Sequence, residues 1–233
     1  MKDRAVGLLL GFTADRLLGD PQKFHPVAGF GSAAASLERL LYADSRRRGA
    51  AHSLVLVGAA TVVGVLADRW GRSPTTRTAV TALATWAVLG GRSLEREAQA
   101  VHAHLAADDR PAARTRLTHL VGRGTNGLDP SEVARAVVES VAENTSDAVV
   151  APLVWGALLG TPGLLAYRAA NTLDAMVGHR SPRYERFGWS AARLDDVLNL
   201  PGARLAGLLT LVAAPSTAPA AWRTWRRDAA AHP

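Results

Sequence analysis

The chain of 233 residues contains no cysteine, and this absence excludes whole classes of chemistry. Without thiols there is no disulfide framework, no thiolate nucleophile and no cysteine metal site. The sequence also lacks a nucleophile elbow, a Walker loop and a dinucleotide-binding fingerprint. Any use of a nucleotide must therefore rest on a site built outside these motifs.

Aromatic side chains are scarce, at 6% of the chain, whereas 48% of the residues are hydrophobic, chiefly Ala, Leu and Val. This composition is typical of an all-α protein. The net charge of +7 comes almost entirely from arginine and suits nucleic acid, an anionic membrane surface or a phosphorylated, carboxylate-rich substrate. We expect no nucleic-acid partner, because no aromatic-interleaved basic patch and no recognition-helix pattern is present.

Two apolar runs, residues 50–66 and 79–91, indicate a membrane. A clean span needs about 20 apolar residues, with a lower limit of roughly 17, so each run is either a short tilted span or a buried core helix. A turn at residues 71–74 joins them, and arginines at the outer ends predict a hairpin whose ends are cytoplasmic. The run at residues 5–12 lacks a small-residue cleavage site and is expected to remain in the mature protein.

A polar helical region follows this hairpin. Residues 94–105 repeat apolar side chains every three or four positions, which predicts an amphipathic helix. Farther along, Asp129 is placed to cap a helix that starts with Pro130.

Two more apolar segments, residues 149–160 and 164–177, are too short to span a bilayer alone. The strongest turn signal in the chain, Gly-Thr-Pro-Gly, separates them. Arg168 and Asp174 in the second segment would each cost about 2.5–3.5 kcal/mol at a bilayer centre, so burial in lipid is unfavourable. We therefore predict a re-entrant or interfacial helical hairpin that returns the chain to the side it left.

This hairpin should bring residues 168–199 beside residues 139–147. The sequence as a whole predicts an all-α, polytopic integral membrane protein with short or re-entrant hairpins and a polar amphipathic middle region. It should form a single membrane-embedded domain over residues 1–233.

The most informative stretch is the acid-rich run that leads into the apolar segment at residue 149. Glu139, Glu143 and Asp147 recur every fourth residue, so on a helix they project from one face. Three like charges repel unless a cation neutralises them. The face is either simply solvated or a divalent-cation site that binds magnesium through carboxylates and nucleotide phosphates.

Other polar groups gather downstream. Arg168 and Asp174 either pair within one helix or, with Asn171 between them, recognise a polar ligand. Asp195 and Asp196, together with Asn199, could coordinate a metal or cap the following segment. Three arginines recur at intervals of three in a loop and could grip phosphate or carboxylate, or contact anionic lipid: Arg180, Arg183 and Arg186.

Near the N-terminus, Asp20 and His25 each precede a proline directly after an apolar segment. They either cap turns or line a site.

These blocks together closely resemble the adenosylcobinamide-phosphate synthase family of cobalamin biosynthesis, known as CobD or CbiB. The resemblance covers nearly the whole chain and rests on residues 15–27, VGR at 121–123, residues 139–155, NTLDAMVGHR at 171–180, FGW at 187–189 and ARLDD at 192–196.

Such a resemblance implies a multi-pass protein of the cytoplasmic membrane whose active-site loops face the cytoplasm. It implies ligation of adenosylcobyric acid, a corrinoid, to (R)-1-aminopropan-2-yl phosphate, an aminopropanol phosphate, with ATP and Mg2+. The implied partners are these two substrates, the lipid bilayer and neighbouring membrane enzymes of the cobalamin pathway.

Amide formation needs an activated carboxylate, cations for developing charge and a base for the amine. We expect Glu139, Glu143 and Asp147 to be catalytic. Metal binding is expected at Glu143, Asp147, Asp195 and Asp196. The expected substrate-binding residues are Asp20, His25, Asn144, Arg168, Asn171, Asp174, Arg180, Arg183 and Arg186.

Two features depart from the family pattern. Gly124 stands where the family often has an acid, so this position is left out of the site. Family members usually continue beyond a His-Pro like that at residues 232–233, so the chain is expected to be truncated at its C-terminus. The alternative function is a membrane permease or scaffold with a polar substrate route, but charges concentrated in loops and half-helices favour the enzyme.

Overall fold

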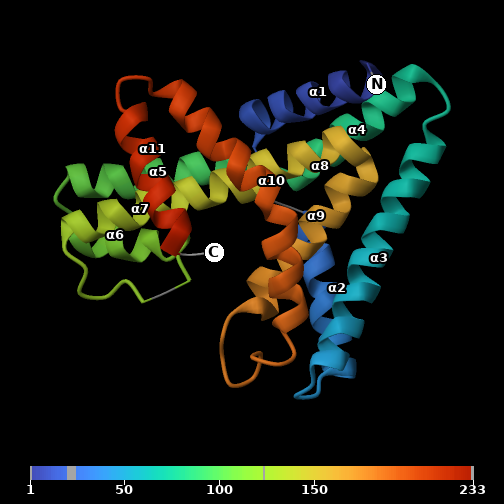
Figure 1. Cartoon of the computed structure of the whole chain (residues 1–233), viewed down its shortest axis with the longest axis horizontal. Coiled ribbons are helices and arrows are strands. Elements are labelled where there is room, and N and C mark those ends of the chain that lie inside the picture. The colour runs from blue at the N-terminus through green and yellow to red at the C-terminus, as the bar shows by residue number, and fades with distance from the viewer. Residues whose placement is uncertain (1, 20–24, 123, 232–233) are drawn as a thin grey trace.

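The computed structural model describes residues 2–19, 25–122 and 124–231, and the described part is entirely helical, without strands. Figure 1 shows helix α3 along one side of the molecule, with α5, α6 and α7 projecting from the opposite side. In chain order the helices are α1 (Lys2–Leu18), α2 (Pro26–Leu41), α3 (Arg46–Trp70), α4 (Pro74–Val88), α5 (Gly91–Ala106), α6 (Arg110–Leu117), α7 (Pro130–Thr145), the π-helical turn η1 (Ser146–Val150), α8 (Ala151–Leu159), α9 (Thr161–Leu173), the π-helical turn η2 (Asp174–Gly178), α10 (Trp189–Ala213) and α11 (Ala218–Ala231).

Local sequence explains where several helices begin. Asp129 accepts hydrogen bonds from the backbone of Ser131 and Glu132, and the Glu132 side chain accepts from the Asp129 N–H in return. With Pro130 at the first helical position, this capping box fixes the start of α7, as the sequence predicts. Ser73 caps α4 in the same way.

Both predicted hairpins are present. α3 and α4 are joined by a turn over residues 71–73, and α8 and α9 by Gly160 alone. Gly160 has φ +74°, a left-handed conformation that glycine adopts without the penalty of a Cβ atom. The hairpin formed by α8 and α9 therefore reverses sharply.

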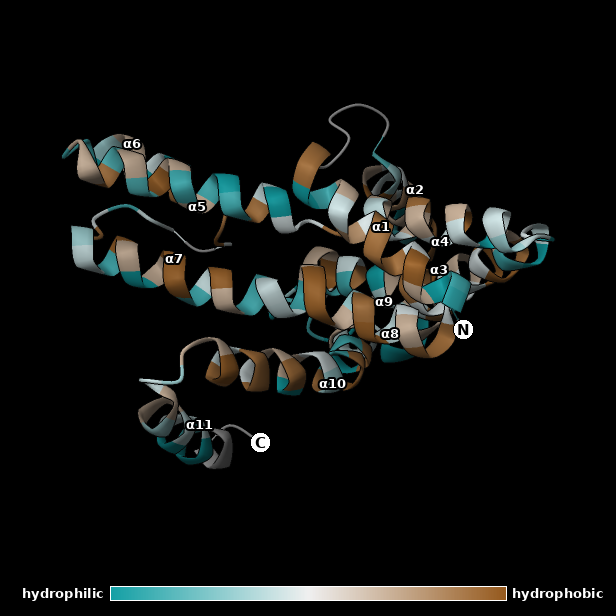
Figure 2. Cartoon of the chain, turned by 90° about the horizontal axis from the view of Figure 1, so that it is seen from above, coloured by the Kyte–Doolittle hydropathy of each residue, from teal (hydrophilic) through white to brown (hydrophobic). Residues whose placement is uncertain are grey.

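Two helices are long and apolar enough to cross a membrane, α3 and α10. The predicted run 50–66 lies inside α3, but the run 79–91 does not reach a comparable length because α4 ends at Val88. α4 packs instead against α1 and α9. Figure 2 shows apolar residues along α8 and α10, whereas α5 and α6 are more polar.

α10 is a single helix, although the sequence contains a proline at its middle. Pro201 has no N–H to donate to the preceding turn. The carbonyl of Val197, four residues earlier, therefore lacks its helical donor, and the indole of Trp155 donates to the adjacent carbonyl of Leu198 at 2.7 Å. The alternative that Asp195 and Asp196 cap a following segment is therefore wrong, since both lie inside α10.

Two separate cores hold the molecule together. The first packs α2, α3, α9, η2 and the start of α10 around Leu173, Val177 and Phe187. Here α3 approaches its neighbours so closely that a Cβ atom at Gly49 would collide with the Phe187 carbonyl, and one at Gly64 with Pro162. The second core joins α5, α6 and α7 around the fully buried Val101 and confirms the amphipathic pattern of the middle region. This second core holds α7 so that the C-terminal end of α7 leads into η1, beside the helices of the first core.

Candidate functional site

Two π-helical turns carry the central carboxylates. α7 passes into η1, which holds Asp147, and α9 passes into η2, which begins with Asp174. π-helical turns are rare and occur frequently at functional sites. Both turns pack against α10, so residues far apart in the sequence face one another here.

Between these elements lies a cavity of about 700 Å³, which we call the acid cavity. Six of the predicted site residues line it, together with His179, Gly178 and the loop after α6. They come from both predicted stretches, which confirms that residues 168–199 lie beside residues 139–147. The six are Glu139, Glu143, Asn144, Asp147, Asn171 and Asp174.

Asn199 of α10 orients Asp147. Its amide nitrogen donates to Asp147 Oδ1, while its Oδ1 accepts from the hydroxyls of Ser146 at 3.2 Å and Tyr167 at 3.3 Å. Asn199 thus ties η1, α9 and α10 together at the wall of the acid cavity.

The local electrostatics disfavour ionised carboxylates at both π-helical turns. Burial raises the pKa of the Asp147 carboxyl above its ordinary value, the Asn199 hydrogen bond opposes this, and the charges of Glu143 and Asp174 add to it. Burial also raises the pKa of the Asp174 carboxyl, with a further contribution from Asp196. His179 lowers the pKa of Asp174 but does not cancel these effects. The cluster therefore favours a proton, or a bound cation, at its carboxylates.

A further carboxylate, that of Asp195, is buried in α10. Asp195 is 8% exposed, and its Oδ1 is buried without a hydrogen-bond partner in the described part of the chain. A buried acceptor left unsatisfied is costly. Asp195 lines neither the acid cavity nor the other cavities of the described chain, so its predicted role as a metal ligand is not supported by the geometry.

The structure does not support a metal site built from protein side chains alone. Within the described ranges no three acidic or imidazole side chains converge closely enough to hold a metal ion by themselves. Magnesium in nucleotide sites is commonly held by one or two carboxylates together with substrate phosphates. The neighbouring carboxylates of Glu143 and Asp147 fit that mode, whereas a protein-only cage is not supported.

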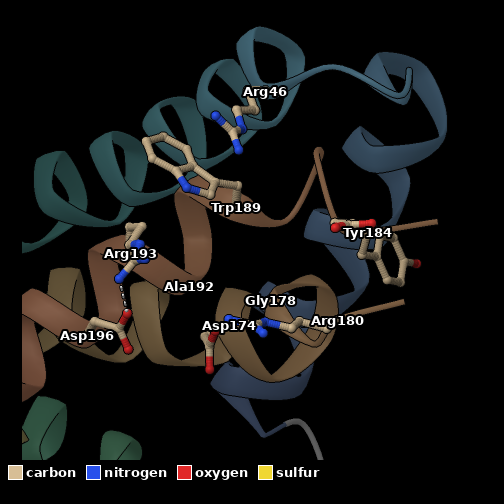
Figure 3. A pocket seen from close by; sticks show the side chains of 10 residues that line it. Arg46, Asp174, Gly178, Arg180, Tyr184, Trp189, Ala192, Arg193 and Asp196 are labelled. Atoms are coloured by element: carbon tan, nitrogen blue, oxygen red, sulfur yellow. Dashed lines mark hydrogen bonds and ion pairs between the residues drawn. The ribbon is translucent and has the colours of Figure 1, made fainter. Parts of the chain in front are cut away.

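A second cavity, of about 620 Å³, adjoins the first, and we call it the arginine pocket. Asp174 and Gly178 line both cavities. Its other lining groups come from the start of α3, the loop after η2 and the first turns of α10, as Figure 3 shows. Of the three loop arginines in the sequence prediction, only Arg180 lines this pocket.

The other two loop arginines lie elsewhere. Arg183 Nη2 is 2.9 Å from Glu38 Oε1, and its guanidinium stacks over the ring of Tyr42. Arg186 pairs with Asp44 at 3.6 Å. Neither lines a cavity with the acid cluster.

The remaining predicted residues are dispersed. His25 Nδ1 accepts from the Val27 N–H and caps α2. Arg168 approaches Asn171 at 3.5 Å and borders an apolar cavity between α2, α3, α4 and α9. Asp196 is exposed and pairs with Arg193 at 3.4 Å, and Asp20 falls outside the described residues.

Some contacts of the site are absent from the sequence prediction. The prediction groups Asn199 with Asp195 and Asp196, whereas in the structure the Asn199 amide donates to Asp147. Tyr167 and His179 reach the site only because the hairpin of α8 and α9 folds back. Arg46 and Arg193 line the arginine pocket because α3 and α10 pack against each other.

Comparison with known proteins shows the family of the chain. The family described as CobD/Cbib protein matches residues 8–233. Proteins named cobalamin biosynthesis protein CobD are 51% identical in Mycobacterium tuberculosis, over 99% of this chain and 74% of the relative, and 42% identical in Chromobacterium violaceum, over 97% and 73%. One from Rhodobacter capsulatus is 38% identical over 98% of this chain and 75% of its own length. No solved structure matches. The chain belongs to the CobD/CbiB family of cobalamin biosynthesis.

Proposed function

We propose that the chain is an adenosylcobinamide-phosphate synthase that joins a carboxylate of adenosylcobyric acid to the amine of aminopropanol phosphate with ATP. A role in cobalamin biosynthesis follows from family membership. The observation that supports the amide ligation is the acid cavity, which brings Glu143, Asp147 and Asp174 together from two distant segments.

The chemistry requires a good leaving group and a neutral amine. Transfer of the terminal phosphoryl group of ATP to the corrinoid carboxylate turns one carboxylate oxygen into a phosphate leaving group. The amine nitrogen then forms the C–N bond while the C–O bond to phosphate breaks, so the products are amide, ADP and phosphate. An ammonium must lose a proton before this attack.

The residues of the acid cavity fit these requirements. A carboxylate whose pKa is raised accepts a proton from an ammonium more readily than an ordinary one, and Asp147 and Asp174 are in this state. Asn144 and Asn171, which also line the cavity, can donate to substrate oxygens.

Magnesium would be held by Glu143 and Asp147 together with nucleotide phosphates, and it would offset negative charge during phosphoryl transfer. The chain's contribution is to hold these two carboxylates on consecutive turns of one face. Asn199 keeps Asp147 in place from the opposite helix.

We also propose that α3 and α10 cross the cytoplasmic membrane and that the site faces the cytoplasm. Both helices have the required length and apolar composition. The arginines at residues 46–48 lie at the start of α3, at the end of the molecule that carries the arginine pocket. Clustered arginines favour the cytoplasmic side of a span.

Single-turnover conversion tests the proposal. Membranes carrying this chain are mixed with adenosylcobyric acid, aminopropanol phosphate and magnesium ATP, with membranes carrying the M. tuberculosis relative in parallel. Adenosylcobinamide phosphate should form with ATP and not without it. No product from this chain, alongside product from the relative, would contradict the ligase function, and uptake of substrate without conversion would favour a permease.

A further inference from the structure

The arginine pocket carries an unusual balance of charge. Three guanidinium groups line it, from Arg46, Arg180 and Arg193, and so do three carboxylates. The carboxylates belong to Asp174, Glu185 and Asp196. The pocket is therefore polar and densely charged but carries no net formal charge when all six groups are ionised.

The charges are only partly matched within the protein. Arg193 pairs with Asp196 at 3.4 Å. Arg46 lies over the ring of Trp189, 5.1 Å from its centroid, and neither Arg46 nor Arg180 forms an ion pair with any residue in the described ranges. Figure 3 shows the arginine side chains distributed around the pocket, with Asp174 below Arg46 and Trp189 in this view. Two cations are thus available to an incoming anion, and the carboxylate of Asp174 lies where the pocket meets the acid cavity.

This arrangement disfavours a polyanion such as a free nucleoside triphosphate, because three carboxylates would repel it. A small molecule that carries one anion and one cation meets both kinds of group. Guanidinium groups bind phosphate through paired, charge-assisted hydrogen bonds. A carboxylate binds an ammonium through the same kind of charge-assisted hydrogen bond.

Asp174 connects the arginine pocket to the acid cavity, where amide formation is proposed. It lines both the arginine pocket and the acid cavity, as does Gly178. A Cβ atom at Gly178 would collide with the Asp174 carboxylate, so glycine is needed for this carboxylate to lie where the two cavities meet. An ammonium bound by Asp174 would therefore face the acid cavity.

From this geometry we infer that the arginine pocket is the subsite of the amine substrate, an aminoalkyl phosphate. Its phosphate lies among Arg46, Arg180 and Arg193, and its ammonium lies at Asp174. The inference rests on the proposed function for the identity of the substrate. It divides the site into an amine subsite in the arginine pocket and an activation subsite in the acid cavity.

Calorimetric titration of the purified full chain in detergent tests the assignment. The probes are 1-aminopropan-2-yl phosphate, isopropyl phosphate, which lacks the amine, 1-aminopropan-2-ol, which lacks the phosphate, and ATP. The wild type should bind the first probe at least about tenfold more tightly than either truncated probe, because each loses a charged partner.

Variants then separate the two ends of the ligand. Arg46→Met, Arg180→Met and Arg193→Met should each weaken both phosphate-bearing alkyl probes by about ten- to a hundredfold and leave the amino alcohol unchanged. Asp174→Asn should weaken the two amine probes and spare isopropyl phosphate. Arg47→Met is the matched control, since Arg47 is the exposed neighbour of Arg46 and lines neither cavity.

The outcomes separate this inference from the proposed function. If amide forms but the arginine variants weaken ATP instead of the aminoalkyl phosphate, the subsite is overturned and the ligase stands. If no amide forms but the probes follow the expected pattern, the ligase fails and the subsite stands. For any methionine variant with an altered unfolding curve, the corresponding glutamine variant is titrated instead, because glutamine also removes the charge, and unchanged phosphate affinity there would also overturn the subsite.

Discussion

The Glu38 side chain is buried and that of Asp147 half-buried, and the surroundings of the two carboxylates are opposite. Glu38 Oε1 accepts from the Arg183 guanidinium and from the Tyr184 hydroxyl, each at 2.9 Å. Asp147 accepts from the neutral amide of Asn199 and faces further acids, Glu143 and Asp174. The charge of Glu38 is matched inside the protein, whereas that of Asp147 is opposed.

The difference indicates what each region is for. A matched charge holds elements together, and Glu38 joins α2 to the loop after η2 in this way. An opposed cluster is unfavourable for folding and is retained where a ligand supplies the missing charge. The comparison predicts that substitutions at Glu38 reduce stability, whereas those at Asp147 and Asp174 reduce activity.

The largest expected effect is on catalysis. Asp147→Asn and Asp174→Asn should each lower single-turnover amide formation by about 10²- to 10⁴-fold, because each removes a candidate proton acceptor. The protein should remain folded, since both substitutions remove charge repulsion. The measurement is the rate per folded protein in membranes. Rates within a few fold of the wild type would remove Asp147 or Asp174 from the mechanism.

A smaller effect is expected at Glu38. Glu38→Gln should lower the Tm of the detergent-solubilised protein by roughly 3–6 °C, because two hydrogen bonds to a charged group are weakened. Asp44→Asn is the control, because the pair it forms with Arg186 is exposed on both sides and should change the Tm by less than about 2 °C. Equal shifts in the two variants would mean that the Glu38 network contributes no more than a surface pair.

The smallest expected effect is the pH dependence of stability. Because the folded-state pKa values of Asp147 and Asp174 are raised, the folded protein binds protons more tightly than the unfolded chain. The free energy of unfolding should therefore rise as pH falls from the raised pKa values towards the ordinary carboxyl range.

The Asp147→Asn, Asp174→Asn double variant isolates this contribution. It should be more stable than the wild type at neutral pH and should lose part of the pH slope. Denaturant unfolding in a chelating buffer measures both, with Asp44→Asn as the control. A steeper slope in the double variant would contradict the assigned direction of the shifts.

Much of the site could be predicted because it depends on local spacing. Glu139, Glu143 and Asp147 fall on one face from the helical repeat alone, and the turn at Gly160 predicts the hairpin that returns Asp174 to them. Capping at Asp129 likewise follows from local hydrogen-bonding rules.

The parts that could not be predicted depend on contacts between distant segments. No spacing rule indicates that Arg183 has its partner in α2, so its placement at a phosphate site is not supported by the geometry. α10 continues through Pro201 while it packs against α3, α8, α9 and both π-helical turns, and local propensity does not contain this information. The arginine pocket arises for the same reason, from the meeting of α3 and α10.

The stacking of Arg46 on Trp189 also constrains the relative direction in which α3 and α10 could cross a membrane. These are the first residues of α3 and α10, so both helices start at the same end of the molecule. If both cross a bilayer, they cross in the same direction, and the chain between them must make one net return. α4 starts that return, but its 15 residues cover only about 22 Å at 1.5 Å per residue, less than a hydrocarbon core of about 30 Å.

Only Leu89 and Gly90 separate α4 from α5, and such a break at membrane depth is tolerated only where protein encloses it. Such an enclosure is present after α4. Asp15 of α1 is fully buried there, and its Oδ2 accepts from the Arg92 N–H at 3.3 Å. α1 would thus shield the junction between α4 and α5 from lipid.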